Sequence, residues 1–247
     1  FVPPRPYERG VGGRPTLIQN TETVAHLGLV ARHGADWFRA VGTPEEPGST
    51  LVTLQGAFRG DGVYEVPRGI RLADLVTLAG GLAAPVQAYL IGGYSGAWLG
   101  ADDAHDLPLD DPSLAAHGAT VGVGVVLALP EAACGVAETA RILRYLADET
   151  AGQCGPCVHG LAAIAGAADQ LARGSAGRDV VERLEAWSWQ VTGRGACHHP
   201  DGATRMLASA LKAFAADVEA HRIGRPCAAA PPRRGPARPK PPRATPR

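Results

Sequence analysis

Short apolar runs separated by turn residues make up the middle of the chain. Four of them have the length of strands and are bounded by glycine, proline or aspartate: 51–56, 63–66, 88–93 and 121–129. The turn at 60–62 should join the first two as a hairpin. Residues 72–78 repeat instead at a helical period and stop at two glycines, so this segment is expected to be a helix.

Helical periods dominate from Gly135 onward. A first helix is expected to start there, with an apolar face formed by Val136, Ala140, Leu143, Leu146 and Ala147. Helices over 161–172 and 179–191 should follow. A last helix, capped by Asp201, should carry the apolar stripe Leu207, Leu211, Phe214 and Val218.

The N-terminal stretch combines a connector with one helix. Residues 1–13 are rich in proline, glycine and arginine, which favours an extended segment. Thr21 or Thr23 is expected to cap a helix with apolar positions at Val24, Leu27, Leu29 and Val30, which continues to Gly42.

Together these elements predict an α+β chain in four parts. The parts are an N-terminal remnant of a larger domain, a β-grasp-like middle domain with its return strand, a C-terminal four-helix bundle that carries the metal ligands, and a disordered Pro/Arg-rich tail. Their expected bounds are 1–45, 46–133, 134–223 and 224–247.

Charge is balanced overall but unevenly distributed. The 247 residues include 24 basic and 24 acidic side chains, yet seven basic and no acidic residues lie beyond position 224. The remaining body is acidic, which gives no reason to expect nucleic acid binding. No apolar run is long enough to span a membrane, and nothing in these residues suggests secretion. Five cysteines in that context favour reduced thiols and a cytoplasmic location.

A CxxC pair is the strongest chemical signal in the chain. Cys154 and Cys157 lie on a Gly/Pro-rich turn, and Cys197 follows forty residues later with His198 and His199 directly after it. Thiolates at such spacing bind iron–sulfur clusters or zinc, and freed backbone N–H groups should point at the sulfur atoms. An accidental pair of buried thiols is the alternative.

The cysteine stretch resembles the flavoprotein (51 kDa-type) subunit of respiratory NADH:quinone oxidoreductase and its relatives in NAD-linked hydrogenases and formate dehydrogenases. That family carries Glu-Ser-Cys-Gly-x-Cys-x-Pro-Cys-Arg-x-Gly and a further cysteine about forty residues on. Its four thiolates hold one [4Fe–4S] cluster. The resemblance places Cys154, Cys157 and Cys197 on ligand positions, whereas Ala151 replaces the first cysteine and Val158 replaces the arginine.

The missing thiolate leaves the fourth ligand and the metal open. His198 is the first choice as a ligand, with His199, His159, Asp148 or water as alternatives, and a three-iron cluster is another solution. Structural zinc bound by the three cysteines and His198 or His199 is a second hypothesis. A scaffold module that has lost its cofactor is a third.

A second likeness to the same family lies at residues 13–23. It implies that Gln19, Asn20 and Thr23 lie at FMN, while a plain polar helix cap is the alternative. The family's Gly-Arg-Gly-Gly-Ala-Gly-Phe loop for NADH and FMN has no counterpart here. Gly10-Val11-Gly12-Gly13 is too short to replace it, so FMN is expected only with an upstream domain.

The middle part resembles the soluble-ligand-binding β-grasp module of the family. Its Gly-Gly-x-Ser-Gly sequence appears at 92–96. Tight turns that pack against the neighbouring domain are the favoured interpretation, and a ligand cradle is the alternative. The segment 102–111 is expected to be an exposed acidic loop.

The resemblance implies that the chain relays electrons from NADH-reduced flavin to a partner redox protein, a ferredoxin-like or thioredoxin-like subunit. It would meet NADH only indirectly and need no acid–base residue. The two remaining cysteines are not expected to take part: Cys134 should be a small buried hydrophobe, and Cys227 lies in the expected tail.

Overall fold

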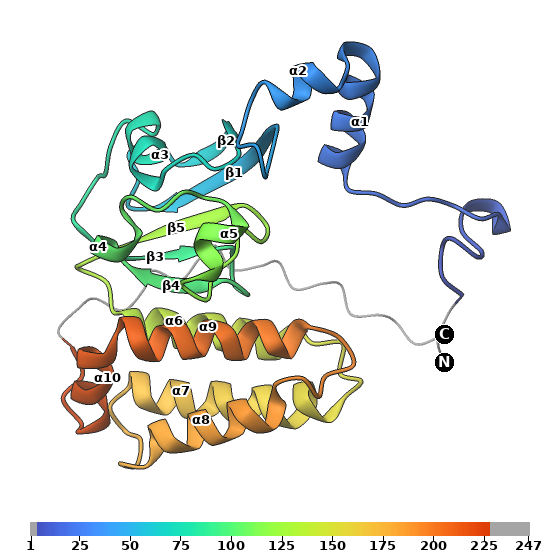
Figure 1. Ribbon diagram of the computed structural model, residues 1–247. Helices are drawn as coiled ribbons and strands as arrows, with labels where there is room; N and C mark the ends of the chain where they lie inside the picture. Colours follow the sequence, from blue (N-terminus) through green and yellow to red (C-terminus); the bar gives the residue numbers. More distant parts are fainter. Residues whose placement is uncertain (1–3, 228–247) are drawn as a thin grey trace, which may run out of the picture.

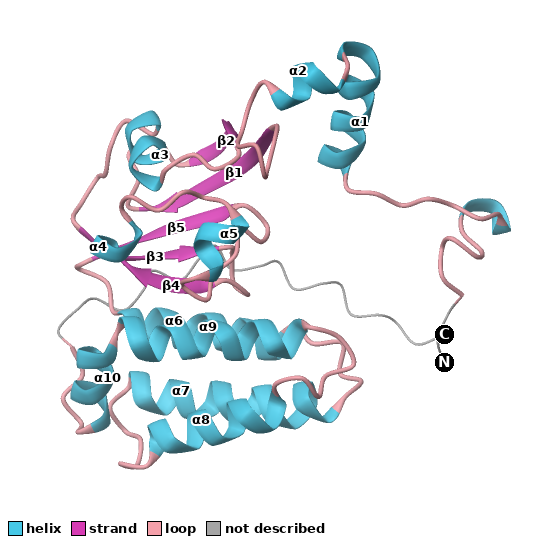
Figure 2. Ribbon diagram, in the orientation of Figure 1, coloured by secondary structure: helices cyan, strands magenta, loops and turns pink. Residues whose placement is uncertain are grey.

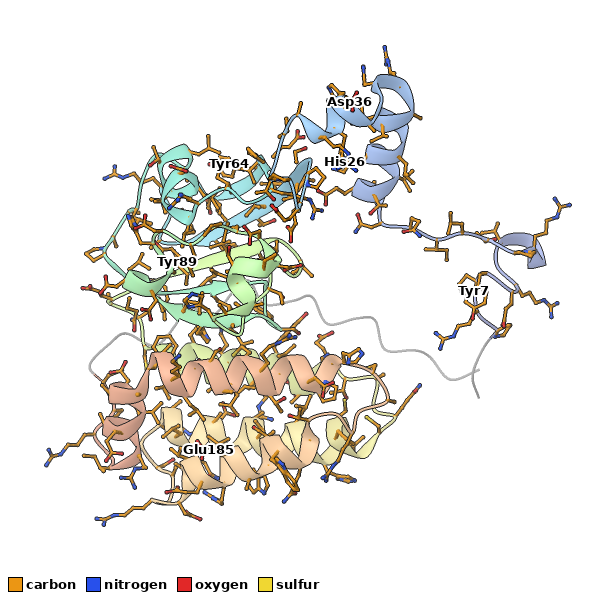
Figure 3. The ribbon with its side chains drawn as sticks, in the orientation of Figure 1. Tyr7, His26, Asp36, Tyr64, Tyr89 and Glu185 are labelled. Carbon is orange, nitrogen blue, oxygen red and sulfur yellow. The ribbon has the colours of Figure 1, made fainter. Side chains whose placement is uncertain are left out.

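A mixed β-sheet lies over a layer of helices in the computed structural model, which describes residues 4–227 (Figure 1). Two short helices project from the far edge of the sheet, and an extended N-terminal segment leads away from them. Tyr7, on that segment, is 68% exposed, whereas Tyr89 is buried within the sheet (Figure 3). Within the described residues no helix is long and apolar enough to cross a bilayer.

The sheet has five strands in the order β2-β1-β5-β3-β4 (Figure 2). Their bounds are β1 Ser49–Gly56, β2 Gly62–Pro67, β3 Val86–Ile91, β4 Ala97–Gly100 and β5 Val125–Pro130. The predicted hairpin is confirmed, because β1 pairs antiparallel with β2. The last strand lies at the centre, parallel to β1 and antiparallel to β3.

The expected strand at 121–129 begins four residues late. Gly122 and Gly124 have φ angles of 55° and 67°, which extended backbone does not allow. A Cβ at Gly124 would lie 2.5 Å from the carbonyl oxygen of Leu51, so the turn depends on glycine at this position. Strand β4 was not anticipated, because its four residues are too short to show a period.

Helices α3, α4 and α5 pack on the face of the sheet that is opposite the helical layer. Helix α3 (Leu72–Leu78) has the predicted bounds. Helices α4 (Ala101–Ala104) and α5 (Asp111–Ala115) interrupt the segment that was expected to be one exposed acidic loop, with Ala104 and Leu109 buried. Asp110 caps α5 by accepting the Ser113 N–H. The expected exposed loop is therefore replaced by a short helix at each end of the segment.

The helical layer contains α6 (Gly135–Asp148), a π-helical turn (Pro156–Leu161), α7 (Ala162–Ala172), α8 (Val180–Val191), α9 (His199–Ala213) and α10 (Ala215–Arg222). Helices α6 and α8 each pack against both α7 and α9. The expected last helix is divided at Phe214, whose ψ angle is 30°. It begins at His199, so Asp201 lies in its first turn and the predicted Asp201 cap is wrong.

The N-terminal helix is also divided. Helix α1 (Thr21–His33) begins at Asn20, whose side chain accepts the Glu22 N–H at 2.8 Å, so neither expected threonine is the cap. Gly34, with φ 87°, separates it from α2 (Ala35–Arg39). A 3₁₀ turn, Val11–Gly13, precedes them. Glu22 ties α1 to the sheet, because its carboxylate accepts from Thr50 Oγ1 (3.0 Å) and the Leu51 N–H (2.9 Å).

Alternation along the central strands produces two cores. Leu90 and Leu129 face the helical layer, and Ile91 and Val126 face the side of α3. The turn at 92–96 packs on the helices as predicted: a Cβ at Gly202 of α9 would lie 2.6 Å from the Ser95 Cβ. The sheet and helix α9 are therefore in direct contact.

The Trp98–Phe214 contact allows a test of this interface. The two buried rings lie 5.2 Å apart in an edge-on arrangement, one from β4 and one from the junction of α9 and α10. We expect Phe214→Ala to lower the free energy of unfolding by about 3–5 kcal/mol, because it opens a cavity between the layers. Leu78→Ala, at a 54% exposed position in α3, is the matched control. Equal denaturation midpoints for both variants would contradict the packing described.

Candidate metal centre

The turn after α6 presents two cysteines. The chain leaves the helix at Asp148, reverses at Gly152 (φ 66°) and enters the π-helical turn at Pro156. The carbonyl of Cys154 accepts the N–H groups of Cys157 (3.1 Å) and Val158 (3.0 Å), which holds the two cysteines on one tight turn. Cys157 is buried and Cys154 is half-buried. Single π-turns of this kind are frequent at functional sites.

The loop between α8 and α9 presents the third cysteine. Helix α8 ends at Val191 and α9 begins at His199, and Cys197 is exposed between them. Asp201 fixes this loop, because its Oδ1 accepts the Gly193 N–H at 2.8 Å. That hydrogen bond, followed by the contact with His198, holds the pKa of the Asp201 carboxyl below its usual range.

The two cysteine loops contact each other. Backbone N–H groups of Ala196 and Cys157 donate to the sulfur of Cys154 and lower the pKa of its thiol. The pKa of Cys157 is raised to about 11, first by burial and then by the neighbouring Cys154 and Cys197 sulfurs. The residue preceding Cys197 thus lies against Cys154, and the three predicted ligands converge from loops at the same end of the helical layer.

The histidines beside the site differ in their hydrogen bonds. His198 has a fully exposed side chain and its Nδ1 lies 3.1 Å from Asp201 Oδ2, so its Nε2 faces solvent. His199 donates from Nε2 to the Leu146 carbonyl at 2.8 Å, so this nitrogen is already engaged in a hydrogen bond with α6. His159 is exposed and lines a shallow cavity with Trp187 and Arg194.

The donor set suits a cluster better than one ion. A tetrahedral zinc with Zn–S bonds of about 2.3 Å holds its sulfurs about 3.8 Å apart. Among the described residues, one group of three or more Cys, His, Asp or Glu has all its ligand atoms within 4.8 Å, and it is the group around His221, away from this turn. The sulfurs of Cys154, Cys157 and Cys197 do not all lie within that distance, so they are too far apart to surround one tetrahedral ion. Soft thiolates that receive N–H groups fit such a group.

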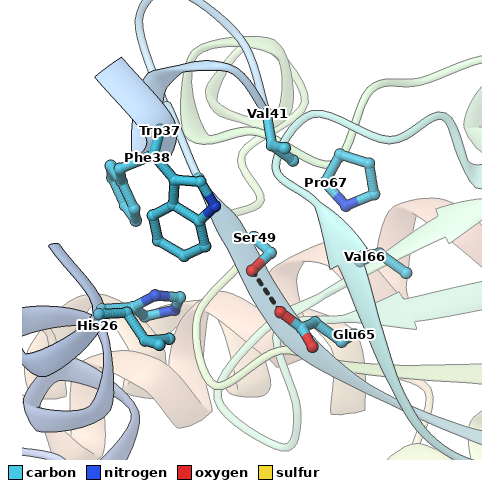
Figure 4. A pocket seen from close by; sticks show the side chains of 10 residues that line it. His26, Trp37, Phe38, Val41, Ser49, Glu65, Val66 and Pro67 are labelled. Carbon is cyan, nitrogen blue, oxygen red and sulfur yellow. Dashed lines mark hydrogen bonds between the residues drawn. The ribbon is translucent and has the colours of Figure 1, made fainter. Parts of the chain in front are cut away.

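The second predicted site lies on a different part of the fold. Gln19, Asn20 and Thr23 are exposed at the start of α1, and the Asn20 side chain acts as a helix cap. Beside them α1 and α2 face the hairpin across a cavity of about 350 Å³ (Figure 4). His26, Trp37 and Phe38 line one side, and Ser49 donates to Glu65 at 2.6 Å on the other. The structure does not bring this site together with the cysteines.

Comparison with known proteins gives the context for this geometry. Residues 137–221 match the family described as the NADH-ubiquinone oxidoreductase-F iron–sulfur binding region. That range includes the three converging cysteines. The match and the cysteine geometry support an iron–sulfur cluster in this chain.

Similar proteins extend the likeness along the chain. The F-type subunit of NADH-quinone oxidoreductase from Streptomyces coelicolor is 30% identical over 226 residues, which are 91% of this chain and 50% of that protein. The NADP-reducing hydrogenase subunit HndC of Solidesulfovibrio fructosivorans is 31% identical over 230 residues, 92% of this chain and 47% of that protein. The chain spans about half the length of the curated relatives it matches.

A solved structure shows the same fold. The crystal structure of an air-oxidised NAD⁺-reducing [NiFe]-hydrogenase aligns with a TM-score of 0.77 and 29% sequence identity, covering 89% of this chain and 38% of that chain. The mixed sheet and the helical layer are therefore shared with a redox enzyme.

The sequence did not reveal the role of Asp201. The sequence predicts Asp201 as a helix cap, whereas its side chain connects α9 to the loop that carries Cys197. We expect Asp201→Ala to speed amide hydrogen exchange in residues 193–198 by roughly three- to tenfold, since a net hydrogen bond is worth about 1 kcal/mol. Asp201→Asn retains an acceptor for Gly193 and should change it less.

Asp179→Ala is the control for this loop, since that exposed carboxylate pairs with Arg183 on its own helix. Mass spectrometry of deuterated peptides gives the rates. Identical exchange in Asp201→Ala and the parent protein would show that the loop is held by other contacts.

Proposed function

Because the chain is homologous to the C-terminal part of the 51 kDa-type flavoprotein subunit of NADH-quinone oxidoreductase, we propose that it is an electron-transfer module. In this proposal it relays electrons from NADH-reduced flavin through a [4Fe–4S]-type cluster to a partner redox protein. The convergence of two cysteine loops within a matched iron–sulfur binding region is the observation that carries it.

Cys154, Cys157 and Cys197 are the proposed thiolate ligands. The cluster would supply one-electron uptake and release at this position. The chain's own contribution is to hold the sulfurs in place and to donate N–H groups to them, as Ala196 and Cys157 do for Cys154. Such donors stabilise the negative charge of a thiolate and thereby tune the potential of the group it binds.

His198 is the proposed fourth ligand, in the place of the thiolate that Ala151 lacks. Its Nδ1 faces the Asp201 carboxylate, which fixes the ring and leaves Nε2 available. A carboxylate behind a histidine is the usual support of a metal-binding imidazole. His199 is less suitable because its Nε2 is engaged with Leu146. A three-iron cluster without a fourth protein ligand is the alternative solution.

The flavin is proposed to come from another domain, in the same polypeptide or in a separate one. Gln19, Asn20 and Thr23 would lie at FMN only when such a domain covers α1. The apolar side chains of α1 support this, because Val24, Leu27 and Leu29 are 53%, 59% and 40% exposed. An exposed apolar stripe on a short helix is typical of a surface that another domain covers.

The middle and end of the chain have separate proposed roles. We assign the sheet with α3 to the β-grasp class, as the support on which the helical layer rests. We assign α6, α7, α8 and α9 to a four-helix bundle whose inter-helix turns carry the ligands. The partner is proposed to be a ferredoxin-like or thioredoxin-like redox protein that approaches the exposed Cys197 side.

Removing the proposed thiolates tests the cluster. We expect Cys154→Ser, Cys157→Ser and Cys197→Ser each to abolish most of the visible absorption, iron and acid-labile sulfide of anaerobically reconstituted protein, because a cubane needs its thiolates. Cys134→Ser, at the opposite end of α6, is the matched control and should retain iron. Unchanged iron in all three variants would refute the assignment.

The same preparation separates the other two functions. Colourless protein with one zinc that disappears in Cys154→Ser would favour structural zinc. Protein that folds and melts alike with and without added iron and sulfide would favour a scaffold without cofactor, because metal binding otherwise adds to folding stability.

Restoring the missing thiolate tests the fourth ligand. Ala151 lies in an exposed turn beside Gly152, where a longer side chain is tolerated. We expect Ala151→Cys to lower the reduction potential of the cluster and slow its loss in air, because cysteine ligation gives lower potentials than histidine ligation. His198→Ala in the parent and in Ala151→Cys completes the cycle: the substitution should shift the potential only in the parent. A shift of equal size in both would exclude His198 as the ligand.

A further inference from the structure

A second group of soft ligands lies at the other end of α6. Cys134, His221 and Cys227 place their ligand atoms within 4.8 Å of one another. Cys134 precedes α6, whereas the cysteine turn follows its last residue, Asp148. At 1.5 Å per residue the 14 residues of α6 separate the two places by about 20 Å. The group therefore belongs to a different site.

The imidazole of His221 is held in the orientation that a metal ligand needs. Its ring is 1% exposed, and Nδ1 donates to the carbonyls of Leu171 (3.1 Å) and Ala172 (3.0 Å) at the end of α7. A proton on Nδ1 leaves Nε2 as the acceptor. Backbone carbonyls that fix the tautomer in this way are the common support of metal-binding histidines.

Both sulfurs face that nitrogen. Cys134 Sγ lies 3.5 Å and Cys227 Sγ lies 3.3 Å from His221 Nε2. For a tetrahedral zinc with Zn–S of about 2.3 Å and Zn–N of about 2.0–2.1 Å, the sulfur-to-nitrogen separation is about 3.6 Å. The observed separations are within a few tenths of an ångström of this value.

The surroundings add two features. The Cys134 sulfur accepts the Ala137 N–H at 3.3 Å at the start of α6, while burial and the contact with Cys227 raise the pKa of its thiol to about 12, so zinc binding must displace its proton. The Nε2 lone pair also accepts the backbone N–H of Cys227 (3.1 Å), a contact that metal binding replaces. Cys227 is half-buried.

We propose that Cys134, His221 and Cys227 bind one Zn²⁺ ion, with water in the fourth position. Two cysteines and one histidine are an established three-ligand set for zinc, and an open fourth position is compatible with it. The ion would join three segments: the start of α6, the end of α10, and the chain that follows. Neither the proposed electron transfer nor the cluster requires this site.

Zinc binding to the reduced full chain tests the proposal. Protein loaded with its cluster anaerobically, stripped with a mild chelator and titrated with Zn²⁺ should bind one ion per chain. Cys134→Ser retains an oxygen that can accept the Ala137 N–H at the start of α6, and Cys227→Ser is a conservative change at a half-buried position. Each variant should bind zinc more than about 100-fold more weakly, because even residues that only support metal ligands contribute 10–100-fold to affinity. Iron content should not change in either variant.

Further variants make the result specific. His221→Asn can still donate to the α7 carbonyls but lacks Nε2, and it should lose zinc as well. His117→Gln, an exposed histidine elsewhere, and Cys154→Ser, at the cluster turn, are controls that should keep the zinc. Co²⁺ added in place of Zn²⁺ should show thiolate charge-transfer and tetrahedral d–d absorption that Cys227→Ser removes.

Three results would overturn the proposal. They are no zinc bound by the parent chain, equal zinc affinity in the parent and in Cys134→Ser and Cys227→Ser, and a Cys134–Cys227 disulfide in protein isolated under reductant. The last would identify the pair as a stable covalent clasp instead. Because iron is measured in the same samples, loss of the cluster is distinguished from loss of zinc.

Discussion

The contact between the Ala196 backbone and the Cys154 sulfur joins loops that are about forty residues apart, and the candidate centre depends on these two loops meeting. It exists because α6 and α8 end at the same side of the helical layer, where α7 and α9 begin. Contact between the two loops, and the Asp201 bond to Gly193, give the three sulfurs a common position.

The sheet determines where this position is. Helix α9 lies against the sheet so closely that Gly202 has no room for a side chain beside Ser95, and Trp98 packs on Phe214 at its far end. The start of α9, with the Cys197 loop before it, is therefore placed by packing along its whole length. In such a close-packed interior a displacement at one end is transmitted to the other. The sheet thereby helps to position the candidate centre.

Those parts of the fold that local patterns control could be predicted from the sequence. Helix α3, the β1–β2 hairpin and the helices that flank the cysteine turn follow from period and glycine stops, and the converging cysteines follow from their spacing and the family likeness. Strand β4 and the late start of β5 depend on pairing and on positive φ angles at glycine, which hydrophobic pattern does not reveal. Asp201 was misassigned because its partner, Gly193, precedes its own helix.

Cys227 shows the limit of composition as evidence. The proline- and arginine-rich segment around it predicted a tail, and the structure places residues 224–227 against α10, with the Cys227 sulfur beside a buried histidine. The remaining residues of that expected tail, 228–247, lie outside the described residues. Burial also separates the two thiol groups on physical grounds. Cys134 and His221 are 3% and 1% exposed and lie with Cys227 at the spacing of ligands on one ion, whereas Cys197 is exposed and the three cysteines of the other group are spaced more widely. Helix α6 thus carries soft donors at both ends, and the spacing of the ligand atoms distinguishes the two groups.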